Sequence, residues 1–109
     1  MHAGGNVDLS MVLNHLKRKG YAMKFTRDAA SLYSYELKQW IKPQQFTVDE
    51  AHLFEGNGNP DADRMLYAVS LSQQEKGYFV DACHVYTDSI SSDMLLKLTG
   101  NHIRYSHFY

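Results

Sequence analysis

Residues that could bind a ligand or a metal ion are concentrated in the second half of the chain. Glu55, Asp61 and Asp63 surround a loop rich in glycine and asparagine, where carboxylates and backbone carbonyls would suit a hard cation such as calcium or magnesium. The spacing lacks the final glutamate of the twelve-residue calcium loop, and Asn-Gly and Asn-Pro are ordinary turn residues. The sequence therefore favours a structural turn and leaves an ion site open.

Two histidines on neighbouring predicted strands, His52 and His84, invite comparison with a transition-metal site completed by Asp81 or Glu50. Such a site needs three or four converging donors, and strand alternation places Asp81 on the opposite face from His84. Hydrogen-bonded histidines within a sheet therefore explain the pair better. The remaining histidines show no ligand spacing: His2, His15, His102 and His107.

Asp81 has apolar neighbours, Phe79 and Cys83, on the same face of its predicted strand. A carboxylate in such surroundings must form an ion pair or accept hydrogen bonds, or its pKa must be raised. One interpretation is a structural bond to a backbone N–H or to a basic group such as Arg64, and the other is an acid in a functional site. Cys83 itself fits a buried, inert thiol better than a nucleophile.

From these residues we predict a ligand-binding site, with no catalytic or metal centre and no cofactor. The candidate ligand-binding residues are Glu55, Asp61, Asp81, His84 and Tyr86. No Ser/His/Asp or Cys/His arrangement can be assigned from spacing, because such groups converge in space rather than in sequence.

The composition narrows the class of function. With 109 residues and a formal net charge of -1, the chain is sized for one domain, residues 1–109. It carries no overall positive field that would attract nucleic acid. No apolar run approaches the ~20 residues of a membrane span, and the first residues lack the blocks of a signal peptide. We therefore expect a cytoplasmic protein with no membrane or nucleic-acid partner, and a small-molecule ligand stays open.

Helices are predicted near both ends of the chain. Apolar residues at helical spacing, a capping Asn6 or Asp8 and a stopping Gly20 predict the first helix over residues 8–19. A capping Ser91 and a second apolar stripe predict another over residues 92–99.

Alternating apolar and polar residues predict four strands between the helices, at 31–37, 46–55, 65–72 and 77–86. The segment between the first two is predicted to be a linker, in which Trp40 covers the edge of the core. The ends at 1–7 and 101–109 are candidates for mobile segments, and the latter is alternatively an added edge strand. The expected fold is α+β, of order α-β-β-β-β-α, with a four-stranded antiparallel sheet and both helices packed on one face.

The last three predicted strands are apolar on both faces, and helices on one face would leave the other uncovered. We therefore expect a homo-oligomer. The leading function is a non-catalytic binding or regulatory module that self-associates through a sheet face. A small enzyme using Asp81, Glu55 and His84 is the alternative. A third possibility is RNA binding, which the missing basic charge argues against. The sheet aromatics that would carry it are Tyr33, Tyr35, Tyr67 and Tyr78.

Several short runs carry a resemblance to a known family: 46–50, 54–56, 59–61, 66–69, 76–77, 80–82 and 85–86. Over roughly Leu9 to Leu98 the chain resembles a family of small bacterial proteins that often carry the label phosphoribosylpyrophosphate synthetase. The label implies a phosphorylated small molecule as ligand or substrate. That enzyme has two doubly wound α/β domains and a glycine-rich phosphate loop leading into a helix, whereas residues 56–63 join two predicted antiparallel strands. The resemblance therefore implies a fold rather than an activity.

Overall fold

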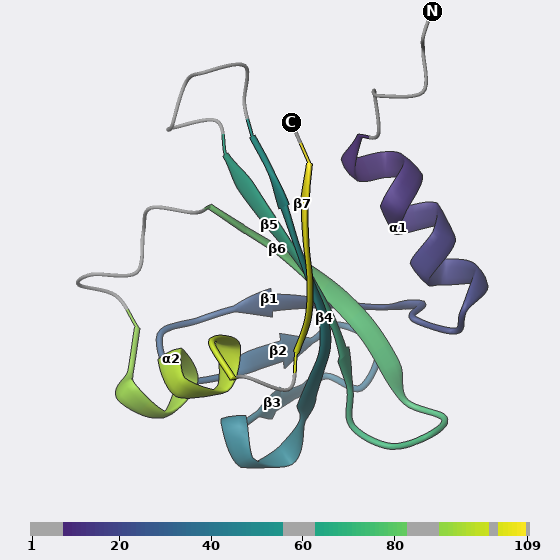
Figure 1. The fold of residues 1–109 in the computed structure, drawn as a ribbon. Coiled ribbons are helices and arrows are strands. Elements are labelled where there is room, and N and C mark those ends of the chain that lie inside the picture. Colours follow the sequence, from purple (N-terminus) through teal and green to yellow (C-terminus); the bar gives the residue numbers. More distant parts are fainter. Residues whose placement is uncertain (1–7, 56–62, 83–89, 101–102, 109) are drawn as a thin grey trace, which may run out of the picture.

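A computed structural model describes residues 8–55, 63–82, 90–100 and 103–108 (Figure 1). The elements follow one another as α1 (Leu9–Arg18), β1 (Met23–Arg27), β2 (Leu32–Ser34), β3 (Gln39–Ile41), the 3-10 helix η2 (Pro43–Gln45), β4 (Thr47–Phe54), β5 (Arg64–Ser70), β6 (Lys76–Ala82), α2 (Ser92–Leu98) and β7 (Arg104–Phe108). The predicted helices and the last three predicted strands are therefore present, and the first predicted strand is reduced to β2. The predicted continuation of the last strand over 83–86 lies outside the described residues.

The described strands form one mixed sheet of seven, in the order β3-β2-β1-β6-β5-β4-β7. Most neighbours are antiparallel, but β1 runs parallel to β6 and β4 runs parallel to β7. The α+β class is thus confirmed, and the prediction of a four-stranded antiparallel sheet was wrong. The additional strands β1 and β3 lie in segments predicted to be connectors, and β7 shows that the tail adds an edge strand.

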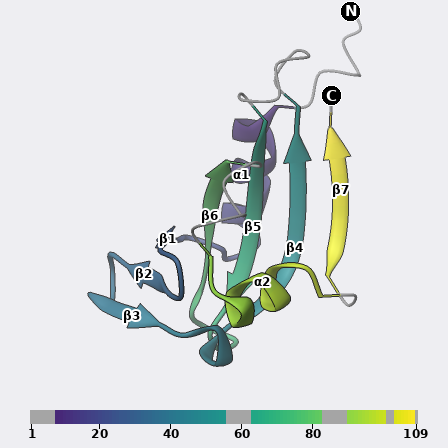
Figure 2. The same ribbon diagram turned by 90° about the vertical axis from the view of Figure 1, so that its left-hand side faces the viewer.

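The two helices lie on opposite faces of the sheet (Figure 2), which corrects the prediction that both pack on one face. Val12 and Leu16 of α1 belong to the same apolar cluster as Leu66 of β5. Met94 of α2 belongs to a second cluster, which includes Tyr67 on the other side of β5. Because each face of the central strands has its own helix, β5 is buried from Met65 to Val69. The uncovered face expected from the sequence therefore does not exist over these strands.

The ends of both helices follow the predicted capping chemistry. Asp8 Oδ1 accepts a hydrogen bond from the Met11 N–H at 3.0 Å, and the Ser91 hydroxyl accepts one from Met94 at 3.2 Å. Gly20 has a φ of 100°, and the N–H of Tyr21 returns to the Leu16 carbonyl at 3.0 Å. These local signals fix where the chain leaves α1.

A bulge in β4 decides which side chains face α1. The pairing register of β4 with β5 shifts between Val48 and Glu50. After the shift, Glu50 lies opposite Ala68 and His52 lies opposite Leu66, and both of these β5 residues pack in the cluster beneath α1. The bulge therefore aims two polar side chains into the interface between α1 and the sheet.

Candidate functional site

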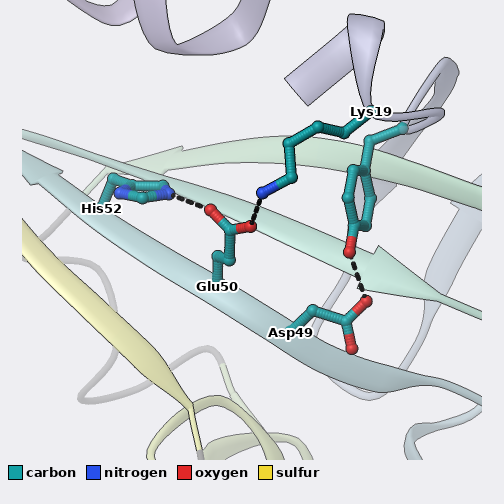
Figure 3. Close-up of polar contacts among 5 residues, drawn as sticks. Lys19, Asp49, Glu50 and His52 are labelled. Atoms are coloured by element: carbon teal, nitrogen blue, oxygen red, sulfur yellow. Dashed lines mark hydrogen bonds and ion pairs between the residues drawn. The ribbon is translucent and has the colours of Figure 1, made fainter. Parts of the chain in front are cut away.

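The first polar cluster lies where the end of α1 meets β4 (Figure 3). Lys19 Nζ is 2.7 Å from Glu50 Oε2, and His52 Nε2 is 2.9 Å from Glu50 Oε1. Nearby, the Tyr21 hydroxyl donates to Asp49 Oδ2 at 2.8 Å. Glu50 is only 7% exposed and His52 only 6%, so a substrate has no access to either group. We interpret this cluster as a brace between α1 and β4 rather than a catalytic site.

The charge state of Glu50 fits this bracing role. Burial raises the pKa of the Glu50 carboxyl, but hydrogen bonds from Lys19 and His52 and their positive charge outweigh burial and hold the pKa below its ordinary value of 4.5. Glu50 is therefore ionised at neutral pH and keeps its bond to Lys19.

Glu50→Gln should lower the free energy of unfolding by about 1–3 kcal/mol at neutral pH, toward the lower end because Lys19 is partly exposed. Since the folded-state pKa of Glu50 is depressed, its contribution is complete above the unfolded-state pKa and disappears as the pH falls through the folded-state pKa. Urea unfolding of the wild type and the variant at several pH values measures this. The two stabilities should converge in acid, and a pH-independent difference would contradict the role assigned to Glu50.

The second polar cluster is an ion pair between β1 and β6. Arg27 Nε bonds to Asp81 Oδ2, and Arg27 Nη2 lies 3.5 Å from Asp81 Oδ1. The two side chains are 6% and 12% exposed. Asp81 is therefore bound to a basic side chain, which agrees with the interpretation of Asp81 as a structural group. The suggested partner Arg64 was wrong: it lies opposite Ala82 rather than Asp81, so its side chain leaves the other face of the sheet.

The structure places two of the five predicted ligand-binding residues. Glu55 is half-buried directly after β4, and Asp81 lies near the end of β6. Both are at the same end of the sheet, with β5 between their strands. The other three lie outside the described residues: Asp61, His84 and Tyr86. Among the described residues, no group of three His, Cys, Asp or Glu side chains could hold a metal ion.

A shallow groove runs between η2, α2 and the turn after β1. It comprises two adjoining hollows of about 290 and 510 Å³, which share Pro43, Gln44 and Asp93. Gln44 Nε2 donates to Asp93 Oδ2 at 3.4 Å, so these polar groups already bind each other. Neither Glu55 nor Asp81 lines the groove. The groove is therefore separate from the two described residues of the predicted site.

A cluster of aromatic rings lies on the solvent-exposed side of β2 and β3. The sequence did not predict that these rings pack together. Tyr33 and Trp40 are cross-strand partners whose ring centroids are 5.0 Å apart at an interplanar angle of 60°. Tyr35 packs edge-on against Tyr33, with centroids 5.3 Å apart at 87°. Trp40 is 59% exposed and Tyr35 is 52% exposed. The prediction that Trp40 covers the core edge was therefore wrong, because Trp40 points to solvent from a strand.

The exposed surface continues from these rings across the neighbouring strands. Thr26 of β1 lies opposite Tyr33, and its hydroxyl is 2.9 Å from the Tyr35 hydroxyl. Strand alternation from the pair Lys24–Tyr78 brings the exposed Val80 of β6 to the same side. We call the surface formed by Thr26, Tyr33, Tyr35, Trp40 and Val80 the aromatic face. The short alternation Gln39-Trp40-Ile41 is the sequence signal that could have indicated it.

Comparison with protein-family profiles, curated proteins and solved structures found no match for this chain. No helix in the described part of the chain is long and apolar enough to cross a bilayer.

Proposed function

We propose that this protein is a non-catalytic binding module and that the aromatic face is its binding surface. The observation that carries the proposal is the exposure of Trp40 and Tyr35 beside Tyr33 in one connected group of rings. Tyrosine and tryptophan combine a large apolar area with a polar group, and they are enriched at the energetic centres of protein interfaces. Connected exposed apolar groups of this kind mark interaction sites more often than isolated ones.

The enzyme alternative receives less support from the described residues. An enzyme acting on a phosphorylated metabolite through Asp81, Glu55 and His84 would need Asp81 to be accessible. Asp81 is largely buried and bound to Arg27 instead. Glu50, the acid bonded to His52, is buried and also bound to Lys19. A non-catalytic module is therefore the more economical proposal.

Self-association through a sheet face, expected from the sequence, is a second candidate function of the same surface. The exposed rings favour it, since burying them against a second copy would remove apolar area from water. Light scattering over a range of concentrations tests it. A dimer in the wild type that Trp40→Ser converts to a monomer would support self-association, and a monomer at every concentration would exclude it.

Selection from a random peptide library tests the binding module itself. The wild type and Leu96→Ser should enrich peptides, whereas Trp40→Ser should not enrich them or bind them. Leu96 is a matched control because it is an exposed apolar residue on α2, away from the aromatic face. Both residues are exposed, so circular dichroism should show intact folding in either variant. Peptides that bind Trp40→Ser as well as the wild type would place the binding surface elsewhere.

A further inference from the structure

We infer that the aromatic face binds an extended, proline-rich peptide that carries acidic residues; this inference rests on the proposed function and names its partner. The first argument is the geometry of the rings. Tyr33 lies on the middle strand and Trp40 on the edge strand of the antiparallel unit β1-β2-β3, with their rings steeply inclined. Inclined neighbouring rings present ridges and slots, into which the rigid ring of proline fits.

The repeat of the ligand allows several contacts on this surface. A polyproline II helix has three residues per turn and places a proline on the same side about every 9 Å along its axis. One proline would pack against Tyr33 and Trp40, whose centroids are 5.0 Å apart, and other residues of the peptide would contact Tyr35 and Val80. Since this helix is already ordered in solution, its binding costs little conformational entropy.

The surface is held in place before any ligand binds. The Tyr35 hydroxyl is bonded to Thr26, and the Tyr35 N–H donates to the Lys24 carbonyl at 3.4 Å. Tyr33 packs between Tyr35 and Trp40. These contacts restrict the rings, which lowers the cost of ordering them on binding.

The charges around the rings favour an acidic peptide. Exposed Lys24 lies on the same side of β1 as Thr26, and exposed Lys38 and Lys42 flank β3 at its two ends. Two carboxylates lie among these lysines: Glu36, which accepts the Lys24 backbone N–H at 3.1 and 3.3 Å, and the exposed Asp28 directly after β1. Three lysines against two carboxylates leave a local excess of one positive charge, which salt would partly screen.

The same charges disfavour the other occupants. A two-fold dimer would bring two copies of this positive excess together, which adds repulsion at the contact. Single-stranded RNA needs several phosphate contacts and ring faces open for stacking, whereas the net charge is -1 and the rings pack edge to face. A proline-rich acidic peptide satisfies both the ring geometry and the charge.

The test uses a synthetic peptide of Pro-Pro-Glu repeats, with Ala-Ala-Glu and Pro-Pro-Lys repeats as controls. Because Trp40 is the sole tryptophan, its emission reports binding at the aromatic face. We expect a saturable change with Pro-Pro-Glu repeats and binding weakened about tenfold or more for either control peptide. Calorimetry should show a similar loss in Tyr33→Ala and Trp40→Ala, and no change in Leu96→Ser.

The outcomes separate this inference from the proposed function. Absence of binding by Pro-Pro-Glu repeats, while library-selected peptides bind in a Trp40-dependent manner, would overturn the proline-rich partner and leave the binding module in place. Equal binding of Pro-Pro-Glu repeats to the wild type and Trp40→Ala would overturn both. Tighter binding of a single-stranded oligouridylate than of any peptide would assign the face to RNA and overturn this inference.

Discussion

Replacement of Arg27 by methionine is expected to lower the free energy of unfolding by about 3–5 kcal/mol, because it leaves the Asp81 carboxylate buried without its partner. The loss of stability arises because the Asp81 carboxylate stays buried without a counter-charge. It does not require that the ion pair itself stabilises the fold strongly. Chemical denaturation of the wild type and of Arg27→Met measures the difference. We expect the loss to be a large part of the total stability of a domain of this size.

A double variant separates the stranded charge from a general packing defect. Arg27→Met combined with Asp81→Leu removes both charges, so most of the lost stability should return. Lys24→Met is the matched control, since Lys24 is exposed on the same strand and its replacement should change stability by about 0.5 kcal/mol or less. A double variant no more stable than Arg27→Met would contradict the assignment of Asp81 as a structural group.

Gly77→Ala is expected to disrupt the parallel joint between β1 and β6. A Cβ atom at Gly77 would overlap the Met23 carbonyl oxygen and lie 2.6 Å from Phe25 Cε2. The carbonyl belongs to the backbone of β1, so relief requires the two strands to separate. We expect a loss of about 3 kcal/mol or a failure to fold, measured by denaturation and circular dichroism.

Gly20→Ala is the matched control for this substitution. Gly20 has a φ of 100° and open space around its α carbon, so alanine there meets only the backbone cost of a left-handed conformation, about 1 kcal/mol. Gly77→Ala should therefore be clearly the more damaging of the two. Equal effects would mean that β1 does not pack closely against β6 at this position.

The parts of the fold that were predictable have strong local signals. Capping and apolar spacing located α1 and α2, and long alternating segments located β4, β5 and β6. The short strands β1 and β3 were not predicted, and the tail strand β7 was only one of two open alternatives, because each has few residues and depends on pairing with distant segments. Both helices were wrongly assigned to one face of the sheet. The face that each helix covers depends on the assembled sheet, and no local pattern in the sequence indicates it.

The candidate site shows the same division. The apolar neighbours of Asp81 correctly indicated that it must be bonded, but strand register decides that Arg27, and not Arg64, is the partner. The ion pair between Lys19 and Glu50 joins residues 31 positions apart, so no local sequence pattern predicts it. Trp40 was visible in the sequence, but its exposure depends on a three-residue strand whose pairing to Tyr33 was not predicted.

The most direct test of the account is the emission of Trp40 while peptides selected on the folded protein are titrated into it, with binding followed in parallel by calorimetry. If the aromatic face is the binding surface, every bound peptide should shift the emission in a saturable manner and reduce quenching by acrylamide, because the indole is withdrawn from water. Peptides that release heat on binding but leave both the emission and the quenching of Trp40 unchanged would contradict the central claim.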